Sequence, residues 1–265
     1  MVEMKDTFCV EKQTQHMIDS IKNYFTNRGN SIDTKAVIGI SGGKDSTVAA
    51  ALLCRALGPD RVVAVKMPFG NQNMEDADKV IQLLGIQKVY NFDIQSACEA
   101  LYGQIENSNI QAIRTNVPAR IRMTTLYMVA AQEHGRVINT GNASEAYIGY
   151  TTKYGDLAGD YAILKDYCVH EIYAIGDYLG LPTELVHKTP DDGMCGVSDE
   201  VRIGFSYETL DNYILHDIFP DDAKTLYLIK EKYRESEHKR NALNIPYIRQ
   251  KCFYKDGEDC GPWEF

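Results

Sequence analysis

The sequence predicts an α/β protein with three layers, in which helices cover both faces of a parallel sheet. Short apolar segments alternate with longer segments of helical spacing, which is the pattern of successive β-α-β units. The chain has 265 residues, enough to bury a sizeable core, and its apolar and charged fractions of 44% and 25% are ordinary for a globular protein. We therefore expect one domain over residues 1–265, built on a parallel sheet of the five-stranded type.

Each expected element has a local signal. Met17, Ile21 and Phe25 share one helix face, and the residues before position 14 are expected to form a mobile arm. Gly58 stops one helix, and Asn116 is the expected N-cap of another, with Pro118 in its first turn. The expected strands are 36–40, 62–67, 88–92 and 137–140, and the expected helices are 14–25, 47–57, 75–84 and 117–133.

The segment Ser41–Ser46 has the composition of a polyphosphate-binding loop. It reads Ser-Gly-Gly-Lys-Asp-Ser and joins the first strand to the next helix. Such a turn directs free backbone N–H groups and the positive end of a helix dipole at one point. The hydroxyls of Ser41 and Ser46 can donate to phosphate oxygens, and Asp45 can hold a Mg²⁺ beside them. A glycine-rich turn that binds nothing is the alternative, and the serines and the aspartate argue against it.

Counting excludes two better-known glycine loops. Walker A needs four residues between its first glycine and the Gly-Lys pair, but only three separate Gly39 from Gly43. Lys44 is followed by Asp45 and not by Ser or Thr, and the dinucleotide pattern G-x-G-x-x-G is absent. The loop instead resembles the SGGxDS signature of ATP pyrophosphatases, which split ATP into AMP and pyrophosphate while they adenylate an acceptor.

Charge and cysteine usage limit the partners and the compartment. A net charge of −9 is opposite to the basic footprint of a nucleic-acid-binding protein, so nucleic acid is not an expected partner. We find no membrane span and no signal-peptide pattern, and expect no membrane association. The seven cysteines form no C-x-x-C pair, which favours reduced thiols in the cytoplasm over disulfides or a zinc site.

A second block of polar residues lies between positions 116 and 160. Arg120 and Tyr127 are seven residues apart and share a helix face that can meet a charged, aromatic ligand. A solvated face with a half-buried tyrosine is the commoner meaning of such a pair. Glu145 follows a strand end and can complete a Mg²⁺ site with Asp45, although a lone glutamate in a loop is usually just solvated.

The segment 149–156 reads Gly-Tyr-Thr-Thr-Lys-Tyr-Gly-Asp and is too aromatic for a simple linker. A loop with a lysine, two threonines and two tyrosines is typical of a segment that closes over a ligand.

Together these blocks resemble the ammonia-dependent NAD synthetases. The likeness covers residues 14–240, and the Thr-Lys-Tyr-Gly-Asp segment beside the SGGxDS loop is its most specific part. It implies the Rossmann-like fold of the adenine-nucleotide alpha-hydrolases. The matching segments are 39–46, 68–72, 116–122, 140–145, 149–156, 199–204 and 238–240.

The resemblance implies an ATP- and Mg²⁺-dependent amidation of deamido-NAD by ammonia, through an adenylated intermediate, that gives NAD, AMP and pyrophosphate. Most of this catalysis is positioning and charge neutralisation. The resemblance also implies a homodimer with the dinucleotide site at its interface.

By the same resemblance, the site residues fall into groups. Asp45 and Glu145 would hold Mg²⁺. Asp45, Lys153 and Asp156 would be catalytic, with Asp156 beside the reacting carboxyl group to orient or deprotonate ammonia. ATP would be bound by Gly39, Ile40, Ser41, Gly42, Gly43, Lys44, Asp45, Ser46 and Thr140. Deamido-NAD would be bound by Arg120, Tyr127, Lys153, Asp160, His238 and Lys239; without the family match, the basic run at 238–240 is equally well an ordinary helix end.

Two departures from the family pattern concern the phosphate side. Where the family has a Thr-Lys pair whose lysine meets ATP, this chain has Cys168-Val169. Where the family has a phosphate-binding hydroxyl, it has Asp191-Asp192. Losing a cation and gaining carboxylates weakens polyphosphate binding, unless another cation compensates. The candidates for that cation are Lys44, Lys165 and Lys188.

Two other functions stay open. A different ATP pyrophosphatase that forms an amide or thio product, such as a tRNA-modifying enzyme, would share the loop. A nucleotide-binding paralogue with weakened catalysis would explain Val169 and Asp191. Only about 35 residues precede the first strand, too few for the amidase domain of glutamine-dependent synthetases, so free ammonia is the expected nitrogen donor. The segment 241–265 has no predicted role.

Overall fold

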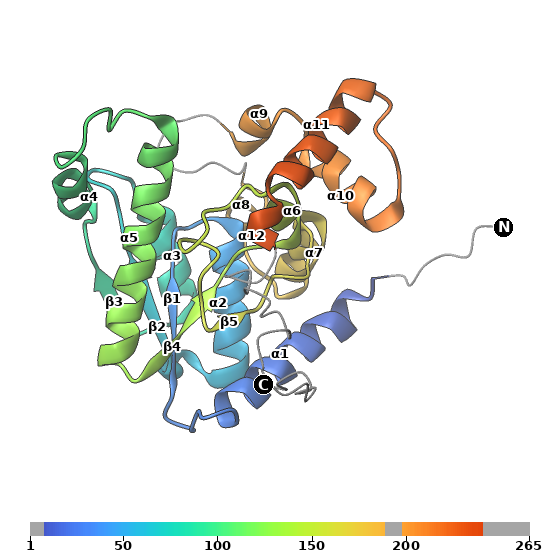
Figure 1. Cartoon of the computed structure of the whole chain (residues 1–265). Helices are drawn as coiled ribbons and strands as arrows, with labels where there is room; N and C mark the ends of the chain where they lie inside the picture. Colours follow the sequence, from blue (N-terminus) through green and yellow to red (C-terminus); the bar gives the residue numbers. More distant parts are fainter. Residues whose placement is uncertain (1–7, 189–197, 241–265) are drawn as a thin grey trace, which may run out of the picture.

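The computed structural model describes residues 8–188 and 198–240 and shows a parallel sheet between two layers of helices (Figure 1). The sheet has the spatial order β3-β2-β1-β4-β5, and its four pairings are all parallel. This confirms the predicted α/β class, the three layers and the five-stranded sheet. The strands are β1 (Lys35–Gly39), β2 (Val62–Lys66), β3 (Lys88–Asn91), β4 (Gly135–Asn139) and β5 (Tyr161–Ala162).

Alternate residues of β1 face opposite helical layers. Ala36 and Ile38 pack in one apolar cluster with α1 (Val10–Thr26), α2 (Lys44–Leu57) and α7 (Val169–Tyr178). Val37 packs in another cluster with α4 (Gln95–Tyr102) and α5 (Gln111–Gln132). All three side chains are fully buried. Helices on both faces explain why this strand is apolar at the consecutive positions 36–38 and does not alternate with polar residues.

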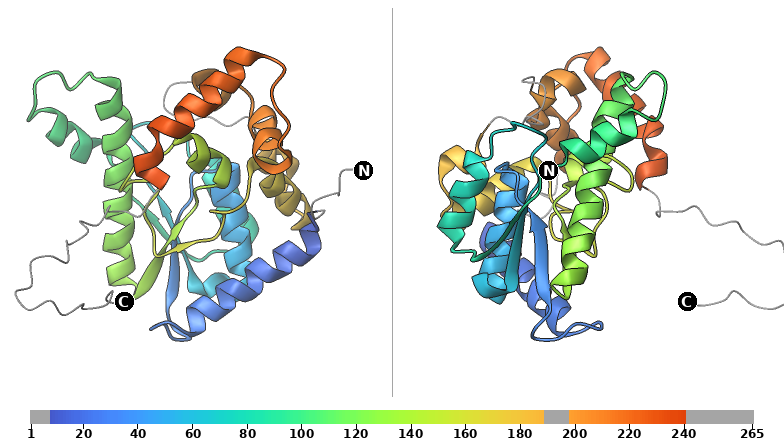
Figure 2. Two further views of the ribbon diagram at one scale, coloured as in Figure 1. Left: turned by 45° about the vertical axis from the view of Figure 1, so that its right-hand side comes forward. Right: turned by 90° about the vertical axis from the view of Figure 1, so that its left-hand side faces the viewer.

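Most of the remaining helices lie above the strand ends. A third apolar cluster, which includes Ile148, Val169 and Tyr207, joins α6 and α7 to the later helices. Figure 2 shows α9 to α12 gathered over the edge of the sheet at which the strands finish. The helices of this group are α6 (Ala143–Ile148), α9 (Asp199–Ile203), α10 (Tyr207–His216), α11 (Ala223–Glu235) and α12 (Glu237–Arg240). The two others, α3 (Glu75–Leu84) and α8 (Thr183–Val186), pack in the first apolar cluster.

The topology fixes where a ligand binds. The chain runs from β1 outward to β3 on one side of the sheet, and then returns to β4 and β5 on the other side. The reversal between β1 and β4 opens a crevice at their carboxyl ends, where ligands of such sheets bind. The predicted polar residues at the ends of these two strands therefore face each other.

Three helices begin earlier than predicted. α1 begins at Val10, so residues 10–13 are helical and not part of an arm. α2 begins at Lys44 and not at Thr47, which places the second half of the phosphate loop in its first turn. α4, β5 and the helices from α6 to α12 are elements that the sequence patterns did not predict.

The third early start is that of α5, where the predicted N-cap at Asn116 is wrong. The helix begins at Gln111 and contains Pro118 in its interior, despite the missing N–H of proline. Ile113 and Val117 pack against the second core cluster, and this burial holds the extra turns in place. Asn116 has a different contact, because its Oδ1 accepts a hydrogen bond from Thr152 Oγ1 at 2.8 Å.

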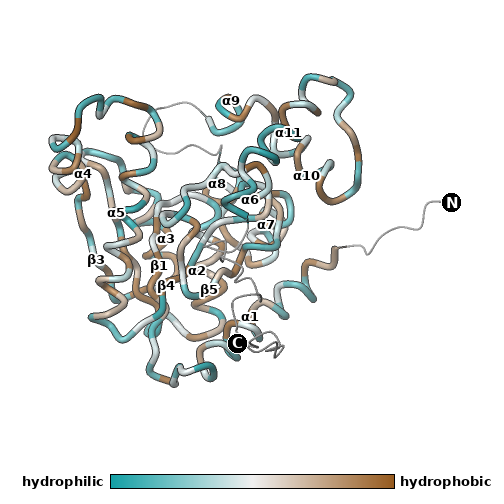
Figure 3. Tube along the Cα trace, viewed as in Figure 1, coloured by the Kyte–Doolittle hydropathy of each residue, from teal (hydrophilic) through white to brown (hydrophobic). Residues whose placement is uncertain are grey.

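Hydropathy follows the layers. Figure 3 shows apolar residues concentrated in the central strands and polar residues on the outer loops. Among the described residues, no helix has the length and apolar character needed to cross a bilayer. Four cysteines in this part of the chain are free thiols, as predicted: Cys9, Cys54, Cys98 and Cys168.

Candidate active site

The loop after β1 directs the first turn of α2 into the crevice. Gly42 has a φ of +83°, and a Cβ there would lie 2.7 Å from the Cβ of Asp76, so this position requires glycine. The N–H groups of a first helical turn have no intrahelical acceptors, and the helix dipole adds positive charge at the same place. The N-cap residue, Gly43, brings no side-chain hydrogen bond. The N-terminus of α2 is therefore available to an anion.

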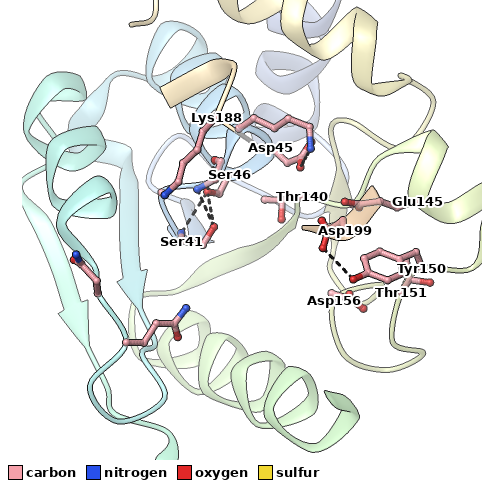
Figure 4. A pocket seen from close by; sticks show the side chains of 16 residues that line it. Ser41, Asp45, Ser46, Thr140, Glu145, Tyr150, Thr151, Asp156, Lys188 and Asp199 are labelled. Atoms are coloured by element: carbon pink, nitrogen blue, oxygen red, sulfur yellow. Dashed lines mark hydrogen bonds and ion pairs between the residues drawn. The ribbon is translucent and has the colours of Figure 1, made fainter. Parts of the chain in front are cut away.

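The two serines of the loop hold each other in place. Ser41 Oγ and Ser46 Oγ lie 3.2 Å apart, and Ser41 Oγ accepts a hydrogen bond from the N–H of Gly43 at 3.2 Å. Ser46 Oγ donates to the carbonyl oxygen of Gly43 at 3.1 Å. Both hydroxyls line the pocket drawn in Figure 4.

The end of β4 forms the opposite side of the pocket. Thr140 lines it, and Asn142 caps α6 by accepting a hydrogen bond from the N–H of Glu145 at 2.9 Å. The Asn142 Nδ2 also donates to Asp45 Oδ1 at 3.2 Å. One amide side chain thus links the two strand ends and brings Glu145 and Asp45 together, as the proposed metal pair requires.

Carboxylates crowd this pocket. Asp45, Glu145, Asp156 and Asp199 all line it (Figure 4). Burial raises the pKa of Glu145 to about 8, and the charge of Asp45 adds to that rise. Burial also raises the pKa of Asp156, although the N–H of Thr152 opposes the shift. Both carboxyl groups are therefore harder to ionise than usual, and burial is the main reason.

Asp45 and Glu145 fit a Mg²⁺ that is bound together with a substrate. Mg²⁺ is usually held by one or two carboxylates, with waters and substrate phosphates as its other ligands. The hydroxyl of Tyr207 is buried without a partner in the described part of the chain, and Glu145 and Asp199 lie in its field. Over residues 8–188 and 198–240, no three His, Cys, Asp or Glu side chains form a metal group by themselves. The donor set therefore suits a cation completed by phosphate oxygens.

Lys44 places a buried ammonium among these carboxylates. Its side chain is 4% exposed, and Nζ lies 2.9 Å from Asp45 Oδ2. The same Nζ lies 5.6 Å from the centroid of the Tyr207 ring. Burial alone would lower the pKa of Lys44, but the charges of Asp45 and Glu145 outweigh it and raise that pKa. The ammonium is therefore charged at neutral pH.

Two neighbouring cavities make up the site. The polar pocket has a volume of about 360 Å³. A more apolar cavity of about 280 Å³ adjoins it and shares Ser41, Ser46, Thr140 and Asp156 with it. The predicted ATP residues Gly39 and Ile40 line this second cavity, with Met67, Met74 and Leu126. A charged half beside an apolar half suits a nucleotide with its polyphosphate.

Four of the six residues predicted to bind the dinucleotide meet where the 149–156 segment contacts α12. Arg120 Nε donates to the carbonyl oxygen of Lys153 at 3.2 Å. The Lys153 Nζ donates to the carbonyl oxygen of His238 at 2.9 Å. Lys239 Nζ donates to two carbonyl oxygens of the segment, those of Gly149 and Thr151, at 2.7 and 2.6 Å. This basic cluster, Arg120–Lys153–His238–Lys239, holds the segment in shape.

Asp156 connects the basic cluster to the polar pocket. It lines the pocket, and while burial lowers the pKa of Lys239, the charge of Asp156 opposes that shift. An acceptor carboxylate held by the basic cluster would therefore reach Asp156 on one side and the phosphate loop on the other.

Tyr127 and Asp160 lie together in a separate place. The Tyr127 hydroxyl donates to Asp160 Oδ1 at 3.1 Å, and Asp160 Oδ2 accepts from the N–H of Val137 at 2.7 Å. Burial and the Asp160 charge raise the pKa of Tyr127 to about 12. Within the described part of the chain, neither residue lines the two cavities. The predicted dinucleotide residues thus form two groups.

The departures at 168–169 and 188–192 have different outcomes. Val169 is fully buried in the third apolar cluster, so its side chain is part of the core and not of a phosphate site. Lys188 lines the polar pocket and its Nζ lies 2.7 Å from Asp76 Oδ2. Lys165 is not among the described residues that line the pocket. Asp191 and Asp192 lie outside the described residues.

Sequence reasoning gave several residues in or beside the pocket no individual role. Tyr150 Oη donates to Asp199 Oδ1 at 2.9 Å, and this pair closes one side of the pocket. Asn142 could have been found, because an asparagine three residues before a glutamate is an N-cap pattern. Asp199 belongs to the matching segment 199–204 but was given no role, and Tyr207 carries no signal. Packing of the C-terminal helices brings Asp199 to the pocket wall and the Tyr207 ring beside Lys44.

A parallel sheet whose reversal point presents an open helix N-terminus beside paired carboxylates defines an α/β enzyme of the nucleotide-binding class. A family model described as NAD synthase matches residues 13–243. The chain belongs to this family.

Relatives and solved structures agree with that assignment. The NH(3)-dependent NAD(+) synthetase of Finegoldia magna is 35% identical over 208 residues, which cover 77% of this chain and 84% of that protein. The same enzyme of Carboxydothermus hydrogenoformans is 30% identical over 245 residues, 90% of this chain and 98% of that protein. Among solved structures, NMN synthetase from Francisella tularensis superposes with a TM-score of 0.81 at 32% identity, covering 91% of this chain and all of that one (100%). The NH3-dependent NAD synthetase from Campylobacter jejuni gives a TM-score of 0.73 at 30% identity, covering 92% and 100%.

Proposed function

We propose that this protein is a C–N ligase that amidates the nicotinate carboxyl group of deamido-NAD with ammonia, at the expense of ATP. The observation that carries the proposal is the position of Asp156. It lines the polyphosphate pocket and also lies in the field of Lys239 in the basic cluster. A carboxylate of the acceptor and the α-phosphate of ATP would meet at that point.

The reaction has two balanced steps. A carboxylate oxygen of the acceptor attacks the α-phosphorus, the bond to the β-phosphate oxygen breaks, and pyrophosphate leaves. The nitrogen of ammonia then attacks the acyl carbon, the bond to AMP breaks, and a proton passes to the Asp156 carboxylate. Burial favours the protonated form of that carboxyl group, which suits a proton acceptor.

The chain's own groups supply the positioning. The first-turn N–H groups of α2 and the hydroxyls of Ser41 and Ser46 would hold the β- and γ-phosphates. Arg120, Lys153, His238 and Lys239 would orient the acceptor. Asp45 and Glu145 would hold Mg²⁺, which neutralises phosphate charge when it is bound.

The test is direct. Purified protein is incubated with ATP, Mg²⁺, deamido-NAD and ammonium, and NAD and pyrophosphate are measured. Formation of both in equal amounts supports the proposal, whereas binding of ATP and deamido-NAD without turnover indicates a weakened paralogue. Replacing ammonium with glutamine tests the nitrogen donor, because the described fold offers no nucleophilic cysteine in the pocket. Omitting Mg²⁺ tests the metal.

A second acceptor has specific support, namely nicotinate mononucleotide. The Francisella tularensis neighbour is an NMN synthetase, and this chain covers its whole length with the higher TM-score of the two solved structures above. Forming NMN by the same chemistry amidates an acceptor that lacks the AMP half. Tyr127 and Asp160, which would meet that half, already bond to each other. The ratio of kcat/KM for deamido-NAD and for nicotinate mononucleotide decides between the two acceptors.

We also propose that residues 1–265 act as one domain and as a homodimer in the cytoplasm, with the dinucleotide site at the dimer interface. Tyr127 and Met128 on α5 are 37% and 53% exposed, which suits a second copy packed on that helix. Four free thiols fit a reducing compartment. Light scattering on wild type and on a Met128→Lys variant tests the dimer, since a buried lysine at the interface would favour the monomer.

A further inference from the structure

The basic run at positions 238–240 ends in an arginine that the proposed function leaves without a role. His238 and Lys239 belong to the basic cluster, and Arg240 follows them as the last residue of α12. Figure 2 shows α12 following α11 and lying beside α6. The contacts of Arg240 therefore bear on how these three helices are joined at the acceptor side of the site.

The guanidinium of Arg240 connects α12 to α6 and α11. Its Nη1 donates to the carbonyl oxygen of Tyr147 at 3.1 Å and to Ser236 Oγ at 2.5 Å, and its Nη2 donates to the carbonyl oxygen of Tyr233. The central carbon of the guanidinium lies 3.6 Å from the centroid of the Tyr233 ring. A guanidinium has five donors in one plane and stacks on aromatic rings, so a single side chain makes all of these contacts at once.

The end of α6 and the start of α12 are in direct contact. Gly149 is the C-cap of α6, and Ser236 is the residue before α12. A Cβ at position 149 would lie 2.0 Å from the Cβ of Ser236, so the two backbones approach as closely as a glycine permits. Because no side chain separates them, a shift of α12 is passed directly to the segment 149–156.

The lysines of the basic cluster differ from Arg240 in what they can exchange. Lys153 Nζ donates to the carbonyl oxygen of His238, and Lys239 Nζ donates to those of Gly149 and Thr151. An ammonium binds a carboxylate or a phosphate more strongly than it binds a neutral carbonyl, so both lysines can turn to an anionic acceptor. Each exchange removes a bond between α12 and the segment 149–156.

We propose that Arg240 is a positioning residue for the acceptor, which holds α12 on the end of α6 while the lysines bind the anionic groups of the acceptor. This rests on the proposed function in placing the acceptor at the basic cluster. α6 has six residues, about 9 Å, and carries Glu145 in its first turn. One short helix therefore bears both a carboxylate proposed for Mg²⁺ and the Tyr147 carbonyl that Arg240 binds. Arg240 thereby fixes the acceptor cluster relative to the carboxylates, and the reaction depends on that positioning.

The test compares binding of the acceptor with binding of ATP, each by calorimetry in the presence of Mg²⁺. Deamido-NAD and nicotinate mononucleotide are the acceptor probes. Arg240→Gln removes the charge and the planar fork, and should weaken acceptor binding about tenfold while ATP binding stays within about twofold. Arg240→Lys keeps the charge without the fork and should lose about threefold. The control is Arg234→Gln on α11, whose side chain is 75% exposed, and it should match wild type.

A second measurement does not depend on the acceptor. The N–H groups of Tyr150 and Gly155 donate to the carbonyl oxygens of Glu145 and Thr152, so their hydrogen exchange reports on the segment 149–156. Without any ligand, Arg240→Gln should speed this exchange about fivefold or more and leave the exchange of β1 and β2 as in wild type. Equally faster exchange in the strands would indicate a general loss of stability and would overturn a positioning role.

Unchanged acceptor binding in Arg240→Gln would overturn the proposal, and so would an equal loss for the acceptor and for ATP. If Arg240→Gln does not fold, Arg240→Lys decides in the same way with the smaller effect. Wild type that binds neither acceptor would refute the proposed function. In that case hydrogen exchange decides the inference: faster exchange confined to the segment 149–156 would support the connection through Arg240, and unchanged exchange would overturn it.

Discussion

The N-termini of α2 and α7 differ in what meets them. Both helices pack in the same core cluster and both begin near the crevice. At α2 the N-cap is Gly43, and the first turn faces the polar pocket without a side-chain cap. At α7 the N–H groups of Val169 and His170 are satisfied by Ser144 and by the buried carboxylate of Asp211.

The difference teaches that a helix N-terminus alone does not make an anion site. Every helix offers the same dipole and the same unpaired N–H groups. At α7 the Ser144 hydroxyl and the Asp211 carboxylate accept hydrogen bonds from these N–H groups, so this terminus has a structural role. At α2 the glycines keep side chains away, and the terminus is left for a ligand.

The largest expected effect concerns the N-terminus of α2, which has no side-chain cap. Asp45→Ala should lower the rate of pyrophosphate release by about a thousandfold, because it removes one of the two carboxylates proposed for Mg²⁺. Acceptor binding should stay within about twofold, since the basic cluster is intact. Rates come from a pyrophosphate assay and affinities from calorimetry. Activity near the wild-type level would refute the metal role.

A substitution at the N-terminus of α7 should change the stability of the protein and not its ligand binding. Asp211 is 2% exposed and accepts hydrogen bonds from Ser144 Oγ and the N–H of His170. Asp211→Asn should lower the free energy of unfolding by about 3 kcal/mol, measured in urea, and leave the Kd for ATP unchanged. Asp19→Asn on the exposed face of α1 is the control. A loss of ATP affinity at full stability would mean that α7 does contribute to the phosphate site.

Two glycines, one next to α2 and one next to α7, differ in the space that a Cβ would find. Gly42 precedes α2 and Gly180 follows the C-terminus of α7, and both have positive φ, +83° and +74°. Gly180→Ala should cost about 1 kcal/mol of stability, because nothing lies within 4 Å of the added Cβ. Gly42→Ala should cost about 2 kcal/mol more, since the Cβ would lie 2.8 Å from the backbone N of Ala77. It should also weaken ATP binding, which Gly180→Ala leaves intact.

The smallest expected effect is a pH dependence of the metal-free protein. The pKa of Glu145 is raised from 4.5 to about 8 by burial first and by Asp45 next. Between these pH values the folded state keeps a proton that the unfolded state has lost, so stability falls as pH rises through this window. The slope from this group is about 1.4 kcal/mol per pH unit inside that window.

Urea unfolding in EDTA at about pH 5.5, 6.5 and 7.5, all inside this window, measures that slope. Glu145→Gln should unfold with a flatter pH dependence than wild type. Parallel curves for the two proteins would show that Glu145 is not the titrating group. The comparison also removes the contribution of Asp156, whose pKa is raised in the same direction.

Much of the fold follows from local signals, for definite reasons. β1 is apolar at consecutive positions because both of its faces are covered, and the glycines after it are required by a left-handed turn at Gly42. The predicted position of α3 is correct at both ends, since acidic residues open the helix and Gly85 closes it. Asn116 misled the prediction of α5, because its amide serves a contact with Thr152 from a distant segment. No pattern within a short window reports such a contact.

The sequence by itself determined the sheet, the phosphate loop and the family, because these depend on residues that are neighbours in the chain. Only the tertiary structure decided how the site is assembled. It joined Asp45 to Glu145 through Asn142, brought Asp199 to the pocket and the Tyr207 ring beside Lys44, and buried Val169 in the core. It also gave Lys44 a buried, charged position beside the loop. The physical reason is that burial and electrostatic environment are properties of the packed molecule, so a residue type alone cannot determine them.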